Sequence, residues 1–275
     1  MTSVHDDIIQ SLWIGPRLTA MERLTIESYL RHGYAFHLYT YGDVANIPEG
    51  TVVRDGREIL HEERIFYYKK HQSVSGFSNF FRYKLLFERG GWWVDMDMVC
   101  LEPLTFDGEH VFASERSGLR SNPTCSAMKA PRGSEAMAWA FAVCESKDTK
   151  TLKWGQTGPQ LLTAAVERFG LQDAVQPPDV FCPVDYEDWR LLLKPDPPEL
   201  PPETRAVHLW HEKWRRAELD MDAAYDPGCI FERLKRHVVG SSELLGSSGS
   251  SGDQAGGTYR GTPRNSEEPE ELFRA

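Results

Sequence analysis

Residues 90–98, GGWWVDMDM, place two aspartates two positions apart at the end of an apolar run that begins with paired glycines. A carboxylate in a buried strand is costly unless another group compensates its charge. Side chains alternate along a strand, so a strand over residues 92–99 would point Asp95 and Asp97 to the same face. A hard divalent cation such as Mg²⁺ or Mn²⁺ prefers oxygen ligands and would relieve their repulsion. The stretch therefore predicts a metal site on Asp97 and Asp95, against the alternative of a solvated strand end with two unrelated acids.

The segment before this strand, residues 75–91, has the apolar spacing of a long helix that ends at Gly90. Asn79 and Arg82 lie three positions apart, on one face of that helix. Arg82 can therefore reach the strand that follows. Two roles stay open for it: a structural ion pair with the two acids, or a planar guanidinium that holds a hydroxyl or phosphate of a ligand.

The N-terminal part of the chain alternates strand, helix and strand. Residues 8–15 predict a strand ended by Gly15 and Pro16, residues 17–33 a helix, and residues 35–41 a second strand. This order implies a βαβ unit and a parallel sheet, that is, an α/β fold with a Rossmann-like N-terminal half. Further strands are predicted at residues 110–116 and 124–131, and further helices at residues 134–146 and 158–170.

The composition changes near residue 240. Residues 240–275 are rich in Gly, Ser and Glu and have little apolar surface to bury, which is typical of a disordered tail. We therefore expect one folded domain over residues 1–239 and a tail over residues 240–275.

The composition also excludes several classes of protein. A formal net charge of −10 argues against a nucleic-acid binder, because no broad basic face is available for phosphates. The five cysteines are odd in number and form no CxxC pair, which predicts reduced thiols and a cytoplasmic location. The first residues lack the pattern of a signal peptide, and no apolar run approaches the ~20 residues of a transmembrane helix.

Residues 77–103 resemble the S-D-x-x-R-x-x-x-L-x-x-x-G-G-x-Y-x-D-x-D block of glycosyltransferases with a DXD-containing sugar-binding region, such as bacterial capsule and lipopolysaccharide sugar transferases. Asn79 and Trp93 depart from the Asp and Tyr of that pattern. The positions that match are Ser78, Arg82, Leu86, Gly90, Gly91, Asp95 and Asp97. The resemblance extends over about residues 8–216 through three further segments: LWIG (12–15), TGPQLLTAAV (157–166) and VHLWHEKW (207–214).

The resemblance implies a GT-A-type fold, a single α/β domain with a mixed central sheet. It implies that Asp97 binds Mn²⁺ or Mg²⁺ directly and that Asp95 contacts the ribose or the donor sugar and reaches the metal through water. It also implies that the late His208 is the third ligand, with His211 as the neighbour that competes for this position. It further implies that Asp95, Asp97 and Arg82 take part in catalysis. Core packing is the alternative for His208 and Trp214. The residues implied to bind the donor are Trp13, Ile14, Gly15, Ser78, Asn79, Arg82 and Trp214.

Two weaker assignments concern acids and a basic segment elsewhere in the chain. Three acids are candidates for a base that activates the acceptor hydroxyl, against the alternative of a solvated surface: Glu115, Asp185 and Asp188. Residues 232–238 predict either a solvated helix face or a peripheral contact with anionic lipid through three side chains: Arg233, Lys235 and Arg236.

We therefore expect a metal-dependent, retaining hexosyltransferase that uses a UDP- or GDP-sugar and a glycan or lipid-linked glycan acceptor, in bacterial surface polysaccharide synthesis. One alternative is a nucleotide-sugar binding module without turnover, which the Asn79 departure keeps open. A second is a sugar-1-phosphate nucleotidyltransferase. That class needs a Gly-rich loop after its first strand, whereas residues 13–24 contain one glycine.

Overall fold

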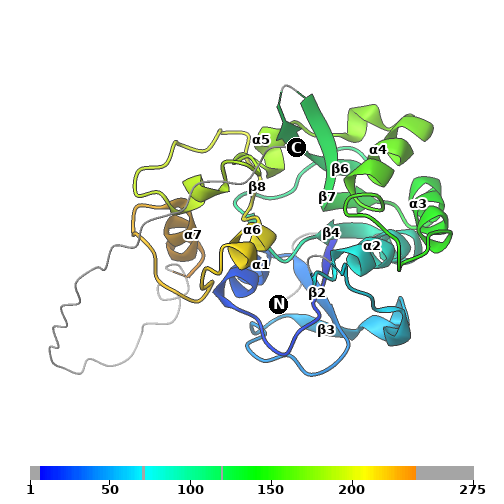
Figure 1. The fold of residues 1–275 in the computed structure, drawn as a ribbon. Helices are drawn as coiled ribbons and strands as arrows, with labels where there is room; N and C mark the ends of the chain where they lie inside the picture. The colour runs from blue at the N-terminus through cyan, green and yellow to red at the C-terminus, as the bar shows by residue number, and fades with distance from the viewer. Residues whose placement is uncertain (1–6, 70–71, 119, 240–275) are drawn as a thin grey trace, which may run out of the picture.

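The structure, a computed structural model, describes residues 7–69, 72–118 and 120–239 (Figure 1). Within these ranges a six-stranded sheet has the order β3-β2-β1-β4-β7-β6, and β5 pairs with β8 in a second sheet. The predicted tail, residues 240–275, lies outside the described residues. The strands are β1 (Ile8–Leu12), β2 (Ala35–Thr40), β3 (Val52–Asp55), β4 (Gly91–Val94), β5 (Met98–Cys100), β6 (Val111–Ser117), β7 (Arg120–Ala130) and β8 (Ala206–His208). The α-helices are α1 (Ala20–Arg31), α2 (Ser75–Arg89), α3 (Glu135–Glu145), α4 (Pro159–Arg168), α5 (Pro178–Phe181), α6 (His211–Arg216) and α7 (Ile230–Val239).

The N-terminal βαβ unit forms the parallel part of the larger sheet. β1 and β2 run parallel, with Ile8 opposite Ala35 and Leu12 opposite Tyr39, and α1 connects them. β1 also pairs in parallel with β4, the strand that leads to Asp95. β4 pairs antiparallel with β7, and β7 with β6, so the sheet is mixed. This arrangement confirms the predicted α/β class, with a Rossmann-like N-terminal half and a mixed central sheet.

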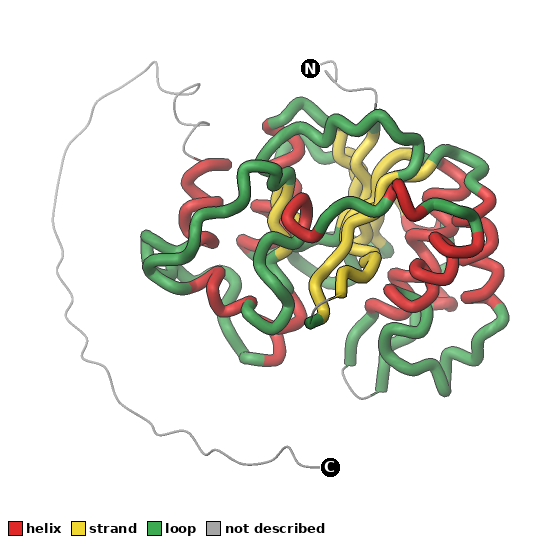
Figure 2. Tube along the Cα trace, turned by 90° about the horizontal axis from the view of Figure 1, so that it is seen from above, coloured by secondary structure: helices red, strands yellow, loops and turns green. Residues whose placement is uncertain are grey.

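Helices cover both faces of this sheet (Figures 1 and 2). α2, α3 and α4 contribute to one buried apolar cluster, and α1, α7 and the β5–β8 pair contribute to the other. The two tryptophans of β4 lie on opposite faces of the sheet. Trp92 belongs to the cluster with α1 and α7, and Trp93 belongs to the cluster with α2, α3 and α4. Alternation along β4 therefore places Trp93 on the α2 side, next to Arg82.

The prediction of one continuous strand over residues 92–99 is wrong. β4 ends before Asp95, and a hydrogen bond from the Met98 N–H to the Asp95 carbonyl (3.1 Å) closes a turn. β5 then leaves the central sheet to pair with β8, with Met98 opposite His208. The pleat that was expected to align Asp95 and Asp97 is therefore interrupted between them. Any convergence of the two carboxylates must come from the turn.

β3 was not predicted, and its burial pattern explains why. The strand lies at the edge of the sheet, parallel to β2 only. Its two valines, Val52 and Val53, are 40% and 50% exposed, so they do not alternate between a buried and a solvated face. Alternation is the main sequence signal for a strand, and a short edge strand with two exposed apolar residues does not show it.

The basic segment near the C-terminus forms α7, whose apolar side faces the core. Ile230, Phe231, Leu234 and Val238 are all buried. The basic side chains are engaged by the protein: Arg233 with Glu199 (3.5 Å), Lys235 with Glu232 (2.8 Å) and Arg236 with the Pro227 carbonyl (2.7 Å). This favours the solvated helix face over the lipid contact. None of the helices in the described ranges has the length and apolar character needed to cross a bilayer.

Candidate functional site

A cavity of about 740 Å³ lies where β1 and β4 end. The chain after β1 and the turn after β4 form part of its wall, as expected for ligand sites at the carboxyl ends of parallel strands. α2, β6, β7 and the segment from His208 to Arg216 contribute further parts of the wall. Eight residues that the sequence assigned to the site line this cavity: Trp13, Ile14, Ser78, Asn79, Arg82, Asp95, Asp97 and His208.

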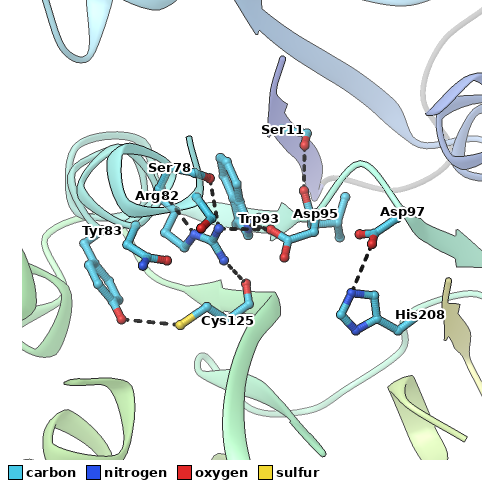
Figure 3. A network of polar contacts seen from close by, with 12 residues as sticks. Ser11, Ser78, Arg82, Tyr83, Trp93, Asp95, Asp97, Cys125 and His208 are labelled. Carbon is cyan, nitrogen blue, oxygen red and sulfur yellow. Dashed lines mark hydrogen bonds and ion pairs between the residues drawn. The ribbon is translucent and has the colours of Figure 1, made fainter. Parts of the chain in front are cut away.

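Asp95 is held by three neighbours. Its Oδ1 accepts the indole N–H of Trp93 (2.9 Å) and forms an ion pair with Nη2 of Arg82 (3.1 Å) (Figure 3). Its backbone N–H donates to the Ser126 carbonyl on β7 (2.7 Å). Burial raises the pKa of Asp95, Arg82 counteracts this effect, and the nearby Asp97 adds to it. The carboxylate therefore has a fixed position and an unfavourable charge that further positive charge would stabilise.

Arg82 is almost completely enclosed, with 5% of its side chain exposed. Its Nε donates to the Ser78 carbonyl (3.3 Å), Nη2 to the Ser78 hydroxyl (2.9 Å), and Nη1 to the Cys125 carbonyl. The guanidinium also lies over the ring of Trp93, 4.7 Å from its centroid. Four of its five N–H groups are thus used within the protein. This geometry supports the first of the two predicted roles, an ion pair that positions Asp95.

Asp97 and His208 form a second buried pair. Oδ2 of Asp97 lies 3.3 Å from Nε2 of His208 and also accepts the backbone N–H of His211 (2.7 Å). Burial disfavours both charges. The positive charge and hydrogen bond of His208 nevertheless lower the pKa of Asp97 to about 2, and Asp97 raises the pKa of His208 well above its ordinary value. The other ring nitrogen of His208, Nδ1, lies 3.8 Å from Sγ of Cys182.

These two pairs meet in a cluster that fits a divalent cation. One ligand atom from each of Asp95, Asp97 and His208 can be chosen so that all three lie within 4.8 Å of one another. Two carboxylates and an imidazole can together hold a divalent cation and leave positions open for a ligand. Within the described residues His208 joins this cluster, whereas the ring of His211 turns to Glu22, 3.5 Å away.

Trp93 is a site residue whose role the sequence did not predict. Its ring supports Arg82 and its N–H bonds Asp95, so it holds both members of the ion pair. The only available signal was the departure from Tyr at this position of the family pattern. Cys182, which faces His208, and Glu22, which faces His211, had no signal at all, because they are far from the motif in the chain.

Two residues implied to bind the donor lie elsewhere. Trp214 is fully buried and donates its indole N–H to the Leu209 carbonyl (2.7 Å), with its ring packed edge-on against Phe231. Trp214 therefore packs in the core, which is the alternative that the sequence left open for it. Gly15 follows Ile14 but is not among the described residues that line the cavity. A side chain there would lie 3.1 Å from the indole nitrogen of Trp13, so Gly15 leaves room for that ring.

The three candidates for a base that activates the acceptor differ in position and surroundings. Glu115 on β6 lines the cavity, and burial raises its pKa. Asp185 is engaged by Arg116 (3.1 Å), and Asp188 is exposed on the surface. Glu115 therefore combines a place in the cavity wall with a raised pKa, as expected of a general base.

Comparison with solved structures finds distant likenesses. The chain shares 15% identity with a structure described as PaToxG Glycosyltransferase, with a TM-score of 0.43 over 61% of this chain and 72% of that chain. For the ligand-free glycosyltransferase domain from the YGT toxin, identity is 7% and the TM-score 0.44, over 90% and 92%. For the apo-form glycosyltransferase GlyE of Streptococcus pneumoniae TIGR4 they are 16% and 0.34, over 63% and 46%. These likenesses are too distant to assign an activity.

The sequence comparison is more informative. No curated protein matches this chain. Residues 33–117, however, match the family described as "Glycosyltransferase sugar-binding region containing DXD motif". The match spans α2, β4 and β5 and includes Asp95 and Asp97. It confirms the resemblance noted in the sequence: residues 33–117 are similar to the DXD-containing sugar-binding region of glycosyltransferases.

Proposed function

We propose that this protein is a metal-dependent hexosyltransferase that moves a sugar from a nucleoside diphosphate to an acceptor hydroxyl. The observation that carries the proposal is the convergence of Asp95, Asp97 and His208 within 4.8 Å in the wall of the cavity. The cavity volume of about 740 Å³ falls in the ~300–1,000 Å³ range of small-molecule sites. A donor with a diphosphate needs local positive charge in a chain whose net charge is −10.

A divalent ion, Mn²⁺ or Mg²⁺, would supply that charge. Asp95, Asp97 and His208 would hold it and leave positions open for phosphate oxygens. Each pair of unit charges at ~4 Å contributes roughly 4 kcal/mol at an effective dielectric of about 20. When bound, the ion stabilises the negative charge that develops on the departing diphosphate.

The other cavity residues have separate proposed tasks. Arg82 positions Asp95 and adds positive charge behind it. Asn79, which donates to the hydroxyl of Thr157 (3.3 Å), is buried in the cavity wall and is proposed to contact a hydroxyl of the donor sugar. Trp13 and Ile14, directly after β1, are proposed to contact the nucleoside. Glu115 is proposed to face the acceptor.

A nucleotide-sugar binding module without turnover is the second candidate. Asn79 favours it, because an amide replaces the carboxylate of the family pattern at a buried position in the cavity. A binding module and an enzyme both require the metal cluster. They differ in whether nucleoside diphosphate is released from the donor, so release separates them.

The test has a binding stage and a turnover stage. Melting temperatures are measured with UDP- and GDP-sugars, each with and without Mn²⁺. We expect one nucleotide class to raise the melting temperature only when Mn²⁺ is present, because a ligand of the native state stabilises it by mass action. We then expect that donor to release UDP or GDP, and Asp97→Ala to remove both effects.

An acid outside the cavity provides the matched control. Asp173 is exposed and does not line the cavity, so Asp173→Ala should behave as the unchanged protein. Binding without release in the unchanged protein would favour the binding module. Release that persists unchanged in Asp97→Ala would overturn the proposed function.

The remaining parts of the proposal concern stereochemistry, acceptor and location. We propose retention of the anomeric configuration, a glycan or lipid-linked glycan acceptor, and a role in bacterial surface polysaccharide synthesis in the cytoplasm. The five cysteines are all buried and unpaired, which supports a reducing compartment. The anomeric proton of the product, followed by NMR, tests retention; an inverted product would refute it.

A further inference from the structure

Glu22 is a buried acid whose carboxylate is only partly satisfied. It belongs to the capping box of α1, where its Oε2 accepts the backbone N–H of Thr19 (2.7 Å) and the Thr19 hydroxyl (2.6 Å). Only 1% of its side chain is exposed. Its other oxygen, Oε1, has no hydrogen-bond partner within the described residues. A buried carboxylate oxygen in this state is costly, so a nearby group that compensates it is significant.

That group is the ring of His211, which connects Glu22 to the cavity. Nε2 of His211 lies 3.5 Å from Oε1 of Glu22, while the histidine side chain is 31% exposed and lines the cavity. Its backbone N–H is fixed to Oδ2 of Asp97 (2.7 Å). Its ring meets that of Trp13 edge-to-face, with centroids 6.2 Å apart. The imidazole therefore lies between the residue after β1 and the metal cluster, with a buried carboxylate behind it.

We propose that His211 binds the ribose of the donor nucleotide and that Glu22 is its positioning residue. The inference rests on the proposed function. In a nucleoside diphosphate the ribose lies between the base and the phosphates. If Trp13 contacts the nucleoside and the cluster at Asp97 holds the diphosphate, the group that reaches the ring between them is the ribose.

The chemistry of a ribose hydroxyl suits this position. A hydroxyl both donates and accepts a hydrogen bond, so it can bond the imidazole whichever ring nitrogen carries the proton. Oε1 of Glu22 faces Nε2 of His211, and the rest of the ring is left to the cavity. A carboxylate behind an imidazole is a common way to fix the ring orientation.

The experiment compares ribonucleotides with deoxynucleotides. Affinities for the nucleoside diphosphate that the unchanged protein binds, UDP or GDP, and for its 2′-deoxy and 3′-deoxy forms are measured by calorimetry with Mn²⁺. We expect a preference of about tenfold for the ribonucleotide over at least one deoxy form, the effect of one hydrogen bond in a buried site. His211→Phe should reduce the preference to less than about twofold, and His211→Gln, which keeps a hydrogen-bonding group, should retain part of it.

Glu22→Gln tests the positioning role through the same ratio, which a general loss of stability would not change. We expect an intermediate preference, because glutamine keeps the shape but not the charge. His37→Phe is the matched control, since His37 is half-buried on β2 and does not line the cavity. It should keep the full preference.

The outcomes separate this inference from the proposed function. If the unchanged protein binds neither UDP nor GDP with Mn²⁺, the proposed function fails and this inference with it. If it binds one of them without preferring the ribose form, or if the preference survives in His211→Phe, only the inference is overturned.

Discussion

Replacing Arg82 by methionine tests whether the guanidinium holds in place the turn after β4 that carries Asp95. Methionine fills much of the space of the side chain above Trp93 but removes every N–H group. The change deprives the Cys125 carbonyl of a buried donor and Asp95 of its charge partner. Both losses occur at a side chain that is 5% exposed, so water cannot readily replace the lost contacts.

The expected cost follows from these two losses. A buried carbonyl that loses its donor costs about 1–3 kcal/mol. Asp95 is 29% exposed and keeps its bond from Trp93, so we assign about 1–2 kcal/mol to the lost ion pair, less than for a fully buried one. The free energy of unfolding should therefore fall by about 2–5 kcal/mol. At roughly 2–4 °C per kcal/mol for a domain of this size, the melting temperature should fall by ~10 °C.

The assay is thermal and urea unfolding of the metal-free protein. Arg89→Met is the matched control on the same helix, because Arg89 is 45% exposed and its pair with Glu58 (3.4 Å) lies on the surface. It should cost less than about 1 kcal/mol. The reasoning is refuted if Arg82→Met melts within about 2 °C of the unchanged protein, or if Arg89→Met is equally destabilising.

Three further predictions concern protons, metal and backbone. Burial would lower the pKa of His208, but Asp97 raises it well above its ordinary value, so a proton must leave before an ion binds. Mn²⁺ affinity, measured by calorimetry, should fall about tenfold per pH unit below that raised pKa. His208→Gln should weaken Mn²⁺ binding and abolish its dependence on pH. An Mn²⁺ affinity of the unchanged protein that does not vary with pH would contradict this. In the metal-free protein His208 holds the pKa of Asp97 at about 2 although burial opposes it, below the unfolded value of about 3.9. The resulting stabilisation of about 2–3 kcal/mol is present above the unfolded pKa and is lost as the pH falls through the folded pKa. Urea unfolding between about pH 5 and pH 2 should show this loss, and Asp97→Asn should lack it. Gly90→Ala should lower the free energy of unfolding by at least about 3 kcal/mol, because φ is +69° and a Cβ would lie 2.5 Å from the Arg132 backbone nitrogen. Gly133→Ala, at φ +81° with open space around it, should lower it by about 1–2 kcal/mol. Equal urea midpoints for the two variants would refute the steric argument.

Local patterns in the sequence were enough to predict the architecture around the site. The spacing of apolar residues predicted α2, and the order of strand, helix and strand predicted the parallel β1–α1–β2 unit. These predictions depend on periodicity along a single segment, which the backbone geometry of each element imposes directly. The residue types of the site were also readable, because two acids and an arginine near paired glycines form a recognisable pattern.

The geometry of the site could not be predicted from local patterns in the sequence. The sequence predicted that Asp95 and Asp97 share the face of one strand, but the strand breaks between them because β5 pairs with β8. That pairing brings His208 to Asp97, and the turn aligns the ligand atoms. Pairing between distant segments thus replaced the local pattern as the cause of the convergence.

What the sequence by itself determined is the α/β class, the N-terminal βαβ unit and the acids of the DXD motif. The tertiary structure alone decided that Trp214 packs in the core, that Arg82 is engaged by the protein, and that His211 bonds Asp97 from 114 residues further along the chain. The physical reason is the range of the interactions. Periodicity reports which side of an element is apolar, but whether a polar side chain faces a cavity, a partner or the core depends on which distant segment packs against it.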